Sequence, residues 1–199
     1  MPEADPPAGV TTGLAGPLTV QHVGDLLLTD GRVGTGNGAE GASGGVSRFV
    51  RVGPRPIGTH LSLAIWDSPR YGRRVAFAEL QVRPGLPVRW TEEPQLAIAT
   101  DGGDGAFARG GALGLALTDA GIDEYVRAMG AGNGLCALTV GADGSTDAVL
   151  FATGLGDGSY PTYVGWDAAD TIVSIVHDGR LVRWRDSGLP GTPPAELRR

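Results

Sequence analysis

The strongest structural signal in the chain is an alternating stretch, Thr59-His60-Leu61-Ser62-Leu63-Ala64-Ile65-Trp66. A period of two puts successive side chains on opposite faces of an extended strand, so Leu61, Leu63 and Ile65 share one face. A turn at 68–72 follows, and residues 74–82 form a second apolar segment. The two segments predict neighbouring β-strands joined by a turn.

Further short segments with the composition of strands follow along the chain. They cover residues 88–90, 96–99, 135–140, 148–153, 160–166 and 171–177. Asp178-Gly179 is typical of a two-residue hairpin turn, and an alternating segment at 182–185 lies beyond it. One helix is expected between a cap at Asp119 and a stop at Gly130. The pattern predicts a mainly β fold, an antiparallel β-sandwich or strongly twisted sheet with one short α-helix.

Glycine and proline are abundant, with 34 and 14 of 199 residues, which favours turns and short strands over long helices. The length is that of a single domain. Residues 17–187 are expected to form one β-rich domain that carries a Gly-rich loop at 31–45. Residues 1–16 are expected to be a disordered or loosely docked tail, and 188–199 an irregular one.

The net charge of the chain is −6, and all 16 basic residues are arginine. Nucleic acid binding needs a basic face, and no run of basic residues supplies one, so nucleic acid is excluded as the main partner. No stretch approaches the ~18 apolar residues of a membrane span, and no N-terminal apolar segment resembles a signal peptide. A bacterial, cytoplasmic, acidic protein is expected; its oligomeric state stays open.

Two acid-glycine loops and an aromatic segment after the second loop carry the candidate ligand-binding residues. They are Asp101, Asp104, Asp157, Ser159, Tyr160, Tyr163 and Trp166. Carboxylates, hydroxyls and the N–H groups of a tight turn can together bind a small polar ligand. The alternative interpretation is structural, because glycine-acid pairs reverse the chain and strand tyrosines commonly fill the core.

Acid–base catalysis would draw on Asp101, Asp157, Tyr160 and His177, if the protein is an enzyme. His177 can equally be a residue at the end of a strand. A Gly-x-Ser-x-Gly sequence occurs at 41–45, but it lies within the Gly-rich loop expected at 31–45. A nucleophile elbow joins a strand to a helix, so it is not indicated there. The histidines lack metal-like spacing and the aspartate loops lack the EF-hand pattern, so neither a metal nor a cofactor is expected.

The stretch from Gly154 to Asp167, which contains Gly-Asp-Gly-Ser-Tyr-Pro-Thr-Tyr, precedes a strand ending in Val176-His177-Asp178. This arrangement resembles the C-terminal signature of a bacterial family, domain of unknown function 4241. Four earlier segments are similar to strands and a loop of that family: 26–33, 74–80, 88–90 and 98–107.

The loop after residue 98 departs from the family pattern at two positions. Ala106 stands where the family has a cysteine, and Arg109 stands where it has an acid. The family has no settled activity. The resemblance therefore implies a common fold and a pairing of the two loops, and it implies no reaction.

Three functions follow from these observations. The first is a small-ligand-binding module whose site is formed by the two acid-glycine loops, and it is favoured because no established catalytic motif is present. The second is a cofactor-independent acid–base enzyme of a bacterial biosynthetic pathway, such as a cyclase, isomerase or hydrolase. The third is an immunity-type interaction protein whose acidic surface covers a basic protein partner.

Overall fold

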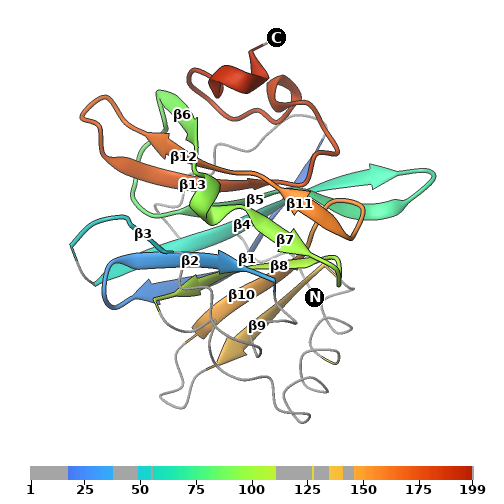
Figure 1. Cartoon of the computed structure of the whole chain (residues 1–199), viewed down its shortest axis with the longest axis horizontal. Helices are drawn as coiled ribbons and strands as arrows, with labels where there is room; N and C mark the ends of the chain where they lie inside the picture. Colours follow the sequence, from blue (N-terminus) through green and yellow to red (C-terminus); the bar gives the residue numbers. More distant parts are fainter. Residues whose placement is uncertain are drawn as a thin grey trace.

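The structure, a computed structural model, describes residues 18–37, 49–54, 56–110, 127, 135–140 and 146–198. Within these residues the chain forms three antiparallel sheets and short 3₁₀ helices (Figure 1). The expected mainly β, antiparallel architecture is confirmed. The helix expected from Asp119 lies outside the described residues, apart from the helical residue Arg127.

The larger sheet has six strands in the order β1-β4-β5-β13-β12-β6. Their bounds are β1 Thr19–Leu28, β4 Ile57–Ser68, β5 Gly72–Gln81, β13 Ile172–Asp178, β12 Thr162–Trp166 and β6 Arg89–Glu92. The alternating segment at 59–66 lies in β4, and the segment at 74–82 lies almost entirely in β5, as predicted. The two strands pair in a register that places Leu61 opposite Leu80.

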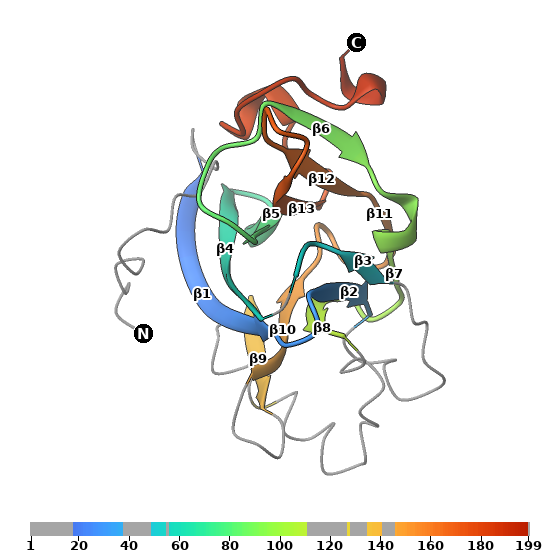
Figure 2. The same ribbon diagram turned by 90° about the vertical axis from the view of Figure 1, so that its left-hand side faces the viewer.

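A second sheet has five strands in the order β3-β2-β8-β10-β9. Their bounds are β3 Phe49–Arg51, β2 Arg32–Gly36, β8 Asp104–Arg109, β10 Thr146–Ala152 and β9 Cys136–Val140. Two short strands, β7 (Ile98–Thr100) and β11 (Gly158–Tyr160), form a separate ribbon beside the two sheets. Figure 2 shows the five-stranded sheet below the six-stranded one.

The main core lies between the inner faces of the two sheets. Leu61, Leu63 and Ile65 of β4 are fully buried there, as the alternation predicts. Phe107 of β8 and Phe151 of β10 face them from the second sheet, with ring centroids 5.4 Å apart. Burial of aliphatic and aromatic side chains from both sheets is what holds a sandwich together.

The outer face of the six-stranded sheet is covered by the C-terminal segment, which lies above the sheet in both views (Figures 1 and 2). This segment contains two 3₁₀ helices, η3 (Trp184–Asp186) and η4 (Ala195–Leu197); a third, η1 (Pro94–Leu96), precedes β7. Trp184 is buried in a second apolar cluster with Phe77, Trp90 and Tyr163. Apolar layers therefore cover both faces of β13, and every residue of this strand is buried.

The predicted hairpin at Asp178-Gly179 is wrong. β13 already pairs with β5 on one side and β12 on the other, so no edge is left for a returning strand. Instead, the Gly179 N–H donates to the Ala76 carbonyl oxygen at 2.8 Å, and Arg180 adopts a positive φ of 56°. The chain then leaves the sheet and crosses its outer face, where 184–186 is helical.

One further expectation, about a loop, needs correction. The loop expected at 31–45 is partly strand, because residues 32–36 form β2 in the five-stranded sheet; residues 38–48 lie outside the description. The segment after residue 188, expected to be an irregular tail, is docked on the sheet. Leu189 is buried, and the backbone N–H of Trp90 donates to the Thr192 carbonyl oxygen at 3.0 Å. The expected tail at 1–16 also lies outside the described residues.

Candidate ligand-binding site

The backbones of the two acid-glycine loops meet. β7 enters the first loop and β11 leaves the second, and the two strands pair with Thr100 opposite Gly158. The Thr153 N–H donates to the Gly103 carbonyl oxygen at 2.9 Å. A Cβ atom on Gly103 would lie 3.0 Å from the Cα atom of Gly156. The pairing of loops implied by the family resemblance is therefore present in the fold.

The acidic side chains of these loops differ in their surroundings. Asp101 and Asp157 are exposed, as is Ser159. Asp104 is buried, and one of its carboxylate oxygens accepts the Thr100 hydroxyl at 3.3 Å. Of the predicted loop residues, only Asp104 is thus held by the protein's interior, and the others face solvent.

Two predicted site residues, Tyr160 and His177, lie in the interior next to the second loop. The Tyr160 hydroxyl donates to the Gly156 carbonyl oxygen at 2.7 Å. His177 is fully buried, with its ring centroid 5.5 Å from that of Tyr160 and 5.2 Å from that of Phe151. Among the described residues, neither ring nitrogen has a hydrogen-bond partner. Desolvation by this apolar shell lowers the pKa of His177 to about 3, so the ring is neutral.

Tyr163 and Trp166 lie elsewhere in the fold. Strand alternation in β12 places Thr162 opposite His177 on the inner face and turns Tyr163 to the outer face, into the cluster with Trp184. Trp166 is half-buried near the end of the strand and donates from its indole N–H to the Thr91 hydroxyl at 2.9 Å. The aromatic segment therefore divides between three places and does not form one site.

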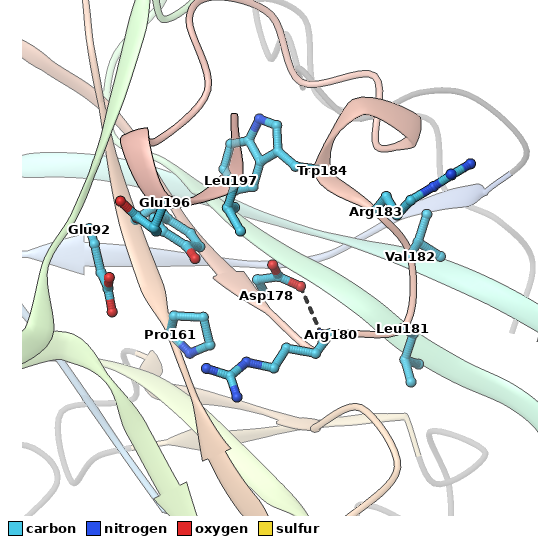
Figure 3. Close-up of a pocket in the computed structure, with 11 residues that line it drawn as sticks. Glu92, Pro161, Asp178, Arg180, Leu181, Val182, Arg183, Trp184, Glu196 and Leu197 are labelled. Atoms are coloured by element: carbon cyan, nitrogen blue, oxygen red, sulfur yellow. Dashed lines mark hydrogen bonds between the residues drawn. The ribbon is translucent and has the colours of Figure 1, made fainter. Parts of the chain in front are cut away.

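A pocket of about 450 Å³ lies on the outer face, between β6, β12, the end of β13 and the C-terminal segment. We call it the Asp178 pocket (Figure 3). Its lining residues are Glu92, Pro161, Tyr163, Asp178, Arg180, Leu181, Val182, Arg183, Trp184, Glu196 and Leu197. Its volume lies in the range of pockets that bind small organic molecules.

The carboxylate of Asp178 accepts only one hydrogen bond from the described residues, from the Arg180 backbone N–H at 2.7 Å. Asp178 is 5% exposed. Burial raises the pKa of Asp178 to about 6, although the Arg180 N–H and the Arg180 charge act in the opposite direction. A carboxyl group with a pKa near neutrality can exchange a proton under physiological conditions.

Tyr163 provides the second unusual group of the pocket. It is 2% exposed, and its hydroxyl makes no hydrogen bond to any described residue. Burial raises the pKa of Tyr163 well above its ordinary value, and the negative charges of Asp178, Glu92 and Glu196 raise it further. The hydroxyl is thus a neutral group, free to donate to or accept from a bound molecule.

The sequence singled out Tyr163 but missed Asp178, Glu92 and Glu196 as site residues. The sequence predicts that Asp178 belongs to a turn, although the period of β13 places it on the same face as Val176, opposite to His177. Tyr163 pairs with Val176 across the sheet, and this register brings the tyrosine and the aspartate to one face. No sequence pattern reveals that register, or that the segment carrying Glu196 folds back over it.

We expect Gly103→Ala to destabilise the protein more than Gly72→Ala does. The two glycines have nearly equal positive φ values of 71° and 67°, but nothing lies within 4 Å of a Cβ at Gly72. The backbone conformation alone should cost about 1 kcal/mol at Gly72, and the contact with Gly156 should bring the loss at Gly103 to about 2 kcal/mol or more. Urea-induced unfolding measures both losses. Equal losses would contradict the close approach of the two loops.

No group of three His, Cys, Asp or Glu side chains able to hold a metal ion occurs in the part of the chain that the structure describes. Nor do the described residues include a helix long and apolar enough to cross a membrane.

In a comparison with known families, the family described as "Protein of unknown function (DUF4241)" matches residues 116–177. The resemblance inferred from the sequence is confirmed over this range. The range contains the second acid-glycine loop and β12 and ends at His177, whereas the Asp101 loop and Asp178 lie outside it. Searches of curated proteins and of solved structures find no match.

Proposed function

We propose that this chain, a relative of the DUF4241 family through residues 116–177, is a small-ligand-binding module whose binding site is the Asp178 pocket. One observation supports the proposal: two buried, ionisable side chains line the same pocket, and each has hydrogen-bonding capacity that no described residue uses. Asp178 and Tyr163 are each at least 95% buried, and both line the pocket.

The free oxygen atoms of these two side chains are not among the fully buried polar atoms without a partner, so they are accessible from the pocket. A bound molecule that donates to Asp178 and bonds to the Tyr163 hydroxyl would replace solvent at these atoms. Pro161, Leu181 and Leu197 add apolar surface to the pocket. A few placed polar groups in an apolar concavity are the usual composition of a small-molecule site.

The exposed acid-glycine loops remain a competing location for the site, and one set of variants separates the two. Small alcohols, amines and carboxylates would be screened by thermal shift, and affinities of the molecules found would be measured by calorimetry. We expect Asp178→Asn to weaken binding about tenfold, the loss of one charge-assisted hydrogen bond. Tyr163→Phe should weaken it about threefold to tenfold.

Asp157→Ala serves as the matched control, since it removes a carboxylate from the second loop. It should leave the affinity unchanged. If Asp157→Ala abolishes binding while Asp178→Asn does not, the site is at the two loops. If no molecule of the set binds, the proposed function is wrong.

Acid–base catalysis is the second candidate function, and the pKa of Asp178 near 6 favours it. A carboxylate with this pKa beside a neutral tyrosine hydroxyl can accept and return a proton during one reaction. Molecules found by the screen would be incubated with the protein and followed by NMR. Turnover that is lost in Asp178→Asn supports catalysis, whereas unchanged spectra leave the protein as a binding module.

A further inference from the structure

We propose that the ligand of the Asp178 pocket is a small organic cation, an ammonium or amidinium group joined to an apolar body. The inference rests on the proposed function, that this pocket binds a small molecule. It follows from the charge balance of the pocket, from the one free hydroxyl inside it and from the composition of its walls.

Negative charge in the pocket exceeds positive charge. Three carboxyl groups line it, those of Glu92, Asp178 and Glu196, against the guanidinium groups of Arg180 and Arg183. Arg183 is committed elsewhere, because its Nε donates to an Asp186 carboxylate oxygen at 2.8 Å, and Figure 3 shows its side chain extending away from Asp178.

Glu92 and Glu196 have no ion pair and no side-chain hydrogen bond with any described residue. Burial is the main cause of the raised pKa of Tyr163; the charges of Asp178, Glu92 and Glu196 raise it further, and the charge of Arg180 lowers it. The three carboxyl groups therefore lie close enough to Tyr163 to create one negative region. A cation placed there gains attraction from all three groups, whereas an anion would be repelled by them.

Tyr163 supplies the second, independent observation. Its side chain is almost fully buried, lines the pocket and has no hydrogen-bond partner among the described residues. A neutral phenol oxygen is a good acceptor for an N–H donor. Trp184 also lines the pocket, and its ring lies 4.9 Å from that of Tyr163.

The remaining walls define the other end of the ligand. Pro161, Leu181, Val182 and Leu197 are apolar and line the same pocket. A ligand with only a charged group, such as a metal ion or ammonium itself, would leave this surface wet. An aliphatic or aromatic body attached to the cationic group buries it and gains hydrophobic free energy.

The test uses a graded series of arylalkyl amines, each with its matched alcohol and carboxylate of equal length. Binding to the wild-type protein is followed at neutral pH by NMR chemical shifts and calorimetry. We expect each amine that binds to do so at least tenfold more tightly than its alcohol, and we expect the carboxylates not to bind. Added salt should weaken amine binding and leave alcohol binding unchanged.

Glu92→Gln and Glu196→Gln are the test variants, and both side chains are exposed enough for the protein to fold without them. Each should weaken amine binding about threefold and leave alcohol binding unchanged. Glu93→Gln is the matched control, because it removes the same charge one residue away and outside the pocket lining. It should have no effect on either ligand.

The outcomes separate this inference from the proposed function. If alcohols or carboxylates bind as tightly as the amines, and Asp178→Asn weakens them, the pocket is a ligand site but its ligand is not a cation. If the amines bind but Glu93→Gln weakens them as much as Glu196→Gln, the attraction comes from the overall charge and the inference is also wrong. If nothing in the series binds, the proposed function fails together with the inference.

Discussion

Trp184→Ala is expected to lower the free energy of unfolding by about 3–5 kcal/mol, as for other large aromatic side chains removed from a core. Trp184 is only 5% exposed, although it comes from a 3₁₀ helix and not from a strand. Its ring meets those of Trp90, Tyr163 and Phe77 edge-on, with centroids 5.3, 4.9 and 6.1 Å away. Removing it leaves a cavity where the C-terminal segment joins the sheet.

The loss is measured by urea unfolding followed by far-ultraviolet circular dichroism, since the variant removes a fluorophore. Trp66→Ala is the matched control, because Trp66 is only half-buried at the rim of the same cluster. Its removal should cost about half as much or less. Equal costs would show that the C-terminal segment contributes little to the stability of the sheet.

Acid is expected to destabilise the protein through His177. The pKa of this ring is about 3 in the folded protein and 6.5 as an ordinary histidine, so between these values the unfolded chain binds more protons. The stability that comes from keeping the ring neutral is complete above pH 6.5 and is lost as the pH falls toward 3. Between pH 7 and pH 4 the resulting loss in the free energy of unfolding is about 3 kcal/mol.

The variant His177→Leu isolates this contribution. It should lose about 3 kcal/mol less stability than the wild type when urea unfolding is compared at pH 7 and pH 4. Phe151→Leu is the control, since it disturbs the same rings without removing a titratable group. It should lower the free energies of unfolding at pH 7 and at pH 4 by the same amount. Asp178 acts with the opposite sign, because its raised pKa makes the folded state bind more protons above pH 4, but it is present in all three proteins. Equal pH dependence in wild type and His177→Leu would contradict a neutral, dry His177.

The strands could be predicted from the sequence where a local pattern determines them. The alternation around Leu61 and Leu63 identifies one strand and the side chains that face the core, because a period of two determines both. The hairpin predicted at Asp178-Gly179 failed for a non-local reason. Its turn composition was suitable, but both neighbours of β13 were already occupied by strands from distant parts of the chain.

The candidate site was less predictable than the fold. Asp101 and Asp157 were recognisable as loop acids, and the fold does bring their loops together. The Asp178 pocket depends on three facts that no local pattern encodes: the register of β12 on β13, the path of the chain after Gly179, and the position of Glu196 over Tyr163. Tyr160 and Tyr163 have similar neighbours in sequence, yet a difference of three positions places them on opposite sides of the sheet.

The opposite orientation of His177 and Asp178 also determines how β13 can be placed. A shift of this strand by one residue against β5 and β12 would exchange the two faces. The aspartate would then enter the shell of Phe151 and Tyr160, where no described donor serves even the histidine. Burying an unpaired carboxylate in such surroundings costs far more free energy than burying a neutral imidazole ring. Two adjacent polar residues thus discriminate against misaligned pairing at the centre of the sheet, where apolar residues alone would tolerate either alignment.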